Sequence, residues 1–152
     1  MLLDTFLRLP YEFLIPNTLF DGELLSFTRA EKQALIGGGL NVIDLPGKCV
    51  QYAQEVLRKN PQLSVHDSFT FVLAESCPGC ILLTGDGGLR TLAAQHEIEV
   101  YGVLWTLDEL HCNCLATPAT VLAALRIIAD DPAVRLPRQE VATSIKRYQG
   151  MQ

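Results

Sequence analysis

Short apolar runs alternate with amphipathic stretches along this chain, a pattern that predicts strands separated by helices. Four runs have the length of buried strands, namely Glu12–Pro16, Leu40–Leu45, Cys80–Thr84 and Ile98–Tyr101. The segments between and after them carry apolar residues at helical spacing, and Lys48–Lys59 is an example. Strands that alternate with helices predict right-handed parallel crossovers, so we expect an α/β fold with a central parallel sheet.

Local signals mark where several helices begin and end. Ser64 and Asp67 have the spacing of a capping box before an apolar helix. Thr117-Pro118 predicts another helix start, with proline at the first helical position. The triple glycine Gly37–Gly39 follows a helix instead of joining a strand to a helix. We therefore interpret it as a helix end and not as a phosphate-binding loop.

The beginning of the chain allows two interpretations. A first strand could end near Asp4, but the next strand already starts at Glu12, and a parallel crossover needs at least about 10–12 residues. The apolar residues of this segment also share one helical face. We therefore predict that Leu2–Leu9 is the end of a helix, and a first strand that carries Asp4 stays the alternative.

Composition places few limits on function. The 152 residues fit one domain, and 49% hydrophobic with 19% charged residues is ordinary for an α/β core. No apolar run approaches the ~20 residues of a membrane span and no signal peptide opens the chain, so we expect a cytoplasmic protein that does not enter membranes. The net charge of −5 argues against wholesale wrapping of nucleic acid. It is compatible with an enzyme that meets phosphates through metal ions.

Two acidic residues occupy predicted helix starts in the centre of the chain. Asp67 is the acid of the capping box, and Asp86 follows directly on the strand Cys80–Thr84. Each is explained on its own as a helix cap. Sites in parallel sheets form where strands end and helices begin, however, so their joint placement predicts a shared acidic site. Thr84 could contribute a hydroxyl that orients one carboxylate.

The stretch Leu63–Gly102 resembles a PIN domain, the nuclease fold of VapC-type toxins. The resemblance rests on Leu63–Ser68 before a helix, on Leu82–Arg90, and on the strand Val100–Gly102 after a further helix. It implies a three-layer α/β/α fold with a central parallel sheet. It also implies that the first strand of that fold, with its catalytic aspartate, is absent from this chain.

The same resemblance implies a domain organisation and a function. Residues 1–116 would form the PIN-like domain, and residues 117–152 a helical extension packed on it. Glu23 matches an essential glutamate of PIN proteins, although an acid here would also complement a helix N-terminus. The implied activity is a toxin-type endoribonuclease in which Glu23, Asp67 and Asp86 are catalytic and bind Mg²⁺ or Mn²⁺. The implied partners are RNA, an antitoxin protein and a second copy of the chain.

The implied mechanism follows from charge. Clustered carboxylates repel one another unless a divalent cation lies among them. A cation placed in this way could activate water and stabilise the charge that develops on a phosphodiester. The basic residues that we expect to contact phosphate are Arg90, Lys32, Arg58 and Lys59.

Two other functions stay open at this point. Without the first aspartate, three acids could hold a metal too loosely for turnover, which predicts a PIN-like binding or interaction module without catalysis. Gly85–Gly88 also has a faint similarity to the late acidic motif of haloacid-dehalogenase phosphatases. Those enzymes need an early Asp-x-Asp after the first strand, which this sequence lacks.

The cysteines suggest a metal or redox site that we do not favour. Cys77-Pro78-Gly79-Cys80 and His111–Cys114 offer soft ligands, but Cys112 and Cys114 would face away from each other on a helix. A thioredoxin-like motif would follow a strand and open a helix, whereas this Cys-x-x-Cys precedes a strand. We therefore predict buried thiols in a reducing compartment.

Overall fold

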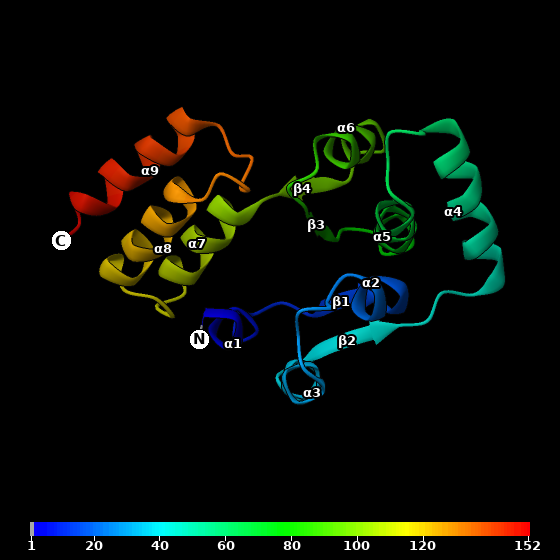
Figure 1. Ribbon diagram of the computed structural model, residues 1–152, viewed down its shortest axis with the longest axis horizontal. Coiled ribbons are helices and arrows are strands. Elements are labelled where there is room, and N and C mark those ends of the chain that lie inside the picture. Colours follow the sequence, from blue (N-terminus) through cyan, green and yellow to red (C-terminus); the bar gives the residue numbers. More distant parts are fainter. Residues whose placement is uncertain (1) are drawn as a thin grey trace. The chain divides into compact units, whose positions relative to one another are not determined.

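The computed structural model describes residues 2–152, which form two compact units (Figure 1). The α/β unit comprises residues 10–100. The helical unit comprises the residues up to Leu9 together with residues 101–152. In the described part of the chain α-helices and strands alternate as the sequence predicts, which confirms a mixed α/β protein.

Two parallel strand pairs form the β-structure of the α/β unit. β1 (Phe13–Pro16) pairs in parallel with β2 (Leu40–Ile43), in a register that sets Phe13 opposite Leu40. The crossover between them runs through α2 (Asn17–Gly22) and α3 (Arg29–Gly37). β3 (Ile81–Leu83) pairs in parallel with β4 (Glu99–Tyr101), and α6 (Gly87–Gln95) connects them.

The single central sheet expected from the sequence is not shown by this structure. β1 pairs only with β2, and β3 only with β4, among the strands of residues 2–152. Leu14 in β1 and Leu83 in β3 are large apolar side chains that remain 37% and 36% exposed. An apolar run identifies a strand but carries little information about which neighbour it pairs with, and the sequence pattern therefore could not settle this point.

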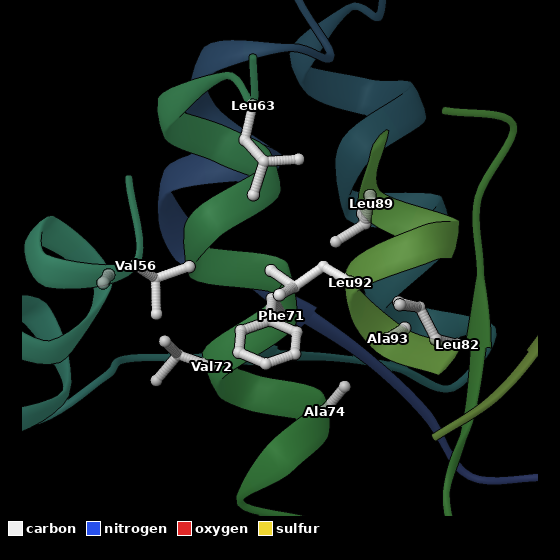
Figure 2. Packing of buried hydrophobic residues seen from close by; sticks show 10 residues of the cluster. Val56, Leu63, Phe71, Val72, Ala74, Leu82, Leu89, Leu92 and Ala93 are labelled. Atoms are coloured by element: carbon white, nitrogen blue, oxygen red, sulfur yellow. The ribbon is translucent and has the colours of Figure 1, made fainter. Parts of the chain in front are cut away.

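Helix α5 (Val65–Glu75) is the centre of the hydrophobic core of the α/β unit. It packs against β1, α2, α6 and α4 (Gly47–Lys59). Figure 2 shows side chains from α4, α5, α6 and β3 gathered around Phe71, which is completely buried. Leu89 in α6 and Ala53 in α4 are each 1% exposed. A fully buried Phe or Leu side chain contributes about 1.5–3 kcal/mol to folding, so this cluster is the main source of stability in the unit.

The predicted helix boundaries agree with the structure. The Ser64 hydroxyl accepts a hydrogen bond from the Asp67 amide at 3.0 Å, and the Asp67 carboxylate accepts one from the Ser64 amide at 3.2 Å. Thr117 caps α8 (Pro118–Asp130), with proline at the start of the helix. α1 (Leu2–Phe6) confirms the predicted helix over the first part of Leu2–Leu9, and Asp4 therefore does not lie on a strand.

The helical unit consists of α1, α7 (Val103–Cys112), α8 and α9 (Arg138–Gln149). α8 packs against α7 and α9. Asp108 of α7 accepts hydrogen bonds from the Tyr148 hydroxyl at 2.7 Å and from the Arg147 guanidinium at 2.5 Å. Burial, and then the hydrogen bond to Asp108, raise the pKa of Tyr148 above its usual range. α7 thus belongs with the C-terminal helices here, whereas the division expected from the sequence placed it within residues 1–116.

Among the helices of residues 2–152, none combines the length and the apolar character that crossing a membrane requires.

Candidate acidic site

The three predicted site acids lie at the ends of three helices of the α/β unit. Glu23 follows α2 and is exposed, and its amide donates to the Leu19 carbonyl at 2.9 Å. Asp67 is the half-buried third residue of α5. Asp86 is the exposed N-cap of α6, where its carboxylate accepts a hydrogen bond from the Leu89 amide at 2.8 Å. The carboxylates of Asp67 and Asp86 therefore each have a local structural use as helix caps, whereas for Glu23 the hydrogen bond involves only the backbone.

A close contact joins the end of α2 to the start of α5. The imidazole of His66 lies against Gly22, and a Cβ atom added to Gly22 would stand 2.6 Å from His66 Cε1. Any larger residue at this position would force the imidazole of His66 to move. Because Glu23 follows Gly22 and Asp67 follows His66, the contact brings the two acid-bearing segments side by side.

A second contact joins the start of α6 to the segment before α5. A Cβ atom added to Gly88 would stand 3.3 Å from the Asp86 carboxylate, 3.3 Å from Gln62 Cγ and 3.4 Å from Leu63 Cδ2. The Asp86 segment therefore lies against the residues that lead into the capping box of Asp67. Both contacts meet at the N-terminus of α5, so the structure brings together the segments that carry all three predicted acids.

Thr84 and Arg90 order the loop that presents Asp86. The Thr84 hydroxyl accepts a hydrogen bond from the Asp86 amide at 3.1 Å. The Arg90 guanidinium donates to the Thr84 carbonyl at 3.3 Å, which holds this cation beside the start of α6. The Thr84 hydroxyl thus binds the backbone amide of Asp86 and not its carboxylate. The role predicted from the sequence, in which this hydroxyl orients a carboxylate, stays a prediction.

The other basic residues predicted to contact phosphate lie on α3 and α4. The Lys32 ammonium stands 5.3 Å from the centre of the Phe20 ring, a cation–π contact. Arg58 and Lys59 are exposed in the last turn of α4, where they complement the helix dipole. A phosphate-binding role for these basic residues stays a prediction.

The acids do not form a metal centre by themselves. Over residues 2–152, no group of three or more His, Cys, Asp or Glu side chains is placed so that it could hold a metal ion. One carboxylate oxygen of Asp67 and one of Asp86 are engaged with backbone amides as helix caps. Mg²⁺ and Mn²⁺ take about six oxygen ligands, of which protein groups supply some and water the rest. The side chains present in this structure do not supply the protein share, so they do not fit either metal.

Two buried polar atoms near this site were not anticipated from the sequence. His66 Nδ1 and Thr18 Oγ1 are buried and have no hydrogen-bond partner within the described residues. The ring of His66 is half-buried against Gly22. The pattern of α2 gives no local signal for the contact, which depends on how two helices distant in sequence pack.

The cysteines are free thiols and are more exposed than expected. Cys49, Cys77 and Cys80 are half-buried, and Cys112 and Cys114 are exposed. The prediction of buried thiols was therefore wrong for the last two residues, which lie on either side of Asn113 where the chain leaves α7.

No known protein-family profile, curated protein or solved structure matches this chain. The resemblance to PIN domains therefore rests on the sequence motifs alone and stays a prediction.

Proposed function

We propose that the α/β unit is a PIN-like endoribonuclease module whose site lies at the N-terminus of α5. The observation that carries this proposal is the pair of glycine contacts, Gly22 with His66 and Gly88 with Leu63. These contacts bring the backbone segments that carry Glu23 and Asp86 to the start of α5, which carries Asp67. The N-termini of α5 and α6 also carry the partial positive charge of the helix dipole, which favours an anion such as a phosphate.

The proposed activity is hydrolysis of RNA phosphodiesters with Mg²⁺ or Mn²⁺. The described side chains alone do not fit the metal, so we derive no cleavage step through it. A complete site requires at least one further donor. In the three-layer sheet of a PIN domain, a strand lying between β1 and β3 would supply that donor and would join the two strand pairs observed here.

The second candidate function is a PIN-like binding or interaction module without catalysis. It is favoured by the absence of a metal-holding group in residues 2–152. Under both functions we propose RNA and an antitoxin-like protein as partners, assembly with a second copy of the chain, and a cytoplasmic location.

The decisive experiment measures cleavage of fluorescently labelled single-stranded RNA with Mg²⁺, with Mn²⁺ and with chelator. For an active nuclease we expect metal-dependent cleavage that Asp86→Asn abolishes. The melting temperature should change little, because asparagine caps a helix about as well as aspartate. If the native chain binds Mn²⁺, the metal should also raise its melting temperature but not that of Asp86→Asn, because a ligand stabilises the state that binds it.

Asp130→Asn is the matched control, because it makes the same change of charge at the last residue of α8 in the helical unit. It should leave cleavage intact. Cleavage that persists in chelator, or that Asp86→Asn leaves unchanged, would exclude the metal-dependent site. RNA that is bound but not cut, with binding weakened by Arg90→Ala, would establish the non-catalytic module instead.

A further inference from the structure

A tight turn brings two cysteines together where α5 leads into β3. The Cys80 amide donates a hydrogen bond to the Cys77 carbonyl at 3.1 Å, which closes a four-residue turn. Gly79 has a φ of +77°, the value that the third residue of a type II turn requires, and Pro78 supplies the fixed φ of the second. The first and last Cα atoms of such a turn are less than about 7 Å apart, and disulfides join Cα atoms about 4.4–6.8 Å apart.

The surroundings of both sulfurs leave them free to react. Cys77 and Cys80 are free thiols and only half-buried. Cys80 Sγ donates a weak hydrogen bond to the Ala74 carbonyl at 3.2 Å, and Cys77 Sγ lies 3.8 Å from the Ser76 hydroxyl. Burial, and then the neighbouring Cys77 thiol, raise the pKa of Cys80, which agrees with two sulfurs close to each other. Neither contact is strong enough to hold its thiol in place.

We propose that Cys77 and Cys80 form a dithiol site that reacts with small-molecule disulfides, such as oxidised glutathione, to give a reversible intramolecular disulfide. In the first step the thiolate of Cys77 attacks one sulfur of oxidised glutathione. A mixed disulfide forms, and one glutathione thiolate leaves. In the second step the thiolate of Cys80 attacks the Cys77 sulfur and releases the second glutathione. The protein loses two protons and two electrons, and the oxidised glutathione takes them up as two thiols.

The position of the site gives the reaction a structural consequence. Forming the disulfide replaces the weak Cys80–Ala74 hydrogen bond by a covalent link between the end of α5 and the start of β3. Because α5 carries the core of the α/β unit, the link would fix the turn that connects this core to the second strand pair. The site is independent of the acidic site at the other end of α5, and it does not rest on the proposed function.

The test is mass spectrometry of the Cys112→Ser/Cys114→Ser chain after exposure to oxidised glutathione and then to an alkylating reagent. Cleavage after lysine and arginine places Cys77 and Cys80 together in residues 60–90, while Cys49 falls in residues 49–58. We expect residues 60–90 to lose the mass of two hydrogens and to take up neither alkyl groups nor glutathione. Reduced glutathione should restore both alkylation sites.

Two further chains complete the design. In Cys80→Ser the second step is blocked, so glutathione should remain attached to Cys77. The chain with Cys77→Ser/Cys80→Ser keeps the more exposed pair Cys112 and Cys114 as a matched control. Cys112 and Cys114 should form mixed disulfides with glutathione. They should give on the order of tenfold less intramolecular disulfide than Cys77 and Cys80. Glutathione that stays on residues 60–90 while both cysteines are present, or a disulfide that joins these residues to Cys49, would overturn the proposal.

Discussion

Replacing Gly22 by alanine tests the contact on which the candidate site depends. A Cβ atom at this position would stand 2.6 Å from Cε1 and 3.0 Å from Nε2 of His66. Distances this short force the imidazole to move, and overpacking of this kind costs about 1–3 kcal/mol. Gly22 is also the last residue of α2, where alanine gains up to about 1 kcal/mol in helix propensity. We therefore expect Gly22→Ala to destabilise the chain by about 0–3 kcal/mol.

A double-mutant cycle separates the two effects. In a His66→Ala background the clash is absent, so Gly22→Ala should become neutral or stabilising by up to about 1 kcal/mol. The coupling energy between the two sites should be about 1–3 kcal/mol. Urea unfolding followed by circular dichroism measures each free energy, and for a chain of this size 1 kcal/mol corresponds to roughly 2–4 °C in melting temperature.

Gly37 provides the matched control. It is also the last residue of its helix, and a Cβ atom there would meet nothing within 4 Å. Gly37→Ala should therefore have the same small effect with and without His66. If Gly22→Ala behaves in the same way as Gly37→Ala, α2 and α5 do not touch as described, and the grouping of Glu23 with Asp67 is wrong.

Three further changes test other parts of the structure. Phe71→Ala removes a fully buried ring and should cost about 3–5 kcal/mol in chemical denaturation. Tyr148→Phe removes the hydrogen bond to the partly exposed Asp108 and should cost about 1–2 kcal/mol. The fold raises the pKa of Tyr148, so the stability that this phenol contributes is complete below about pH 10 and is lost as the pH rises further. The difference in unfolding free energy between the native chain and Tyr148→Phe should therefore shrink in alkaline unfolding experiments. The double variant Leu14→Lys/Leu83→Lys should reduce self-association in light scattering, because charge on an edge strand opposes edge-to-edge pairing between chains. Self-association that these lysines leave unchanged would place the contact elsewhere.

Much of the local structure could be predicted from the sequence because its causes are local. Capping by Ser64 and Thr117 depends on residues within one turn, and the helix end at Gly37–Gly39 depends on glycine itself. The capping box of α3, from Thr28 to Glu31, has the same signature, which could have been recognised in the same way. Strand positions were also predicted within a few residues, because short apolar runs between turn signals leave few alternatives.

The arrangement of the strands and of the site could not be predicted in the same way. Strand pairing and the contact between Gly22 and His66 depend on packing between elements distant in sequence. A carboxylate at a helix start is compatible with capping and with metal binding, and the sequence alone does not separate these two uses. The structure shows the capping hydrogen bonds of Asp67 and Asp86 directly. Whether the same carboxylates also serve catalysis stays a prediction.

The two strand pairs also have a consequence for the order in which the chain folds. Each pair closes within a short stretch of sequence, residues 13–43 for one and residues 81–101 for the other, so neither must wait for distant parts of the chain. Helix α5 lies between these stretches in sequence, packs against β1, and shares the core cluster of Phe71 with Leu82 of β3. We therefore expect assembly of the α/β unit to be a late step in which two locally formed halves meet on one helix. A defect in α5 would leave two strand pairs that each form but do not come together.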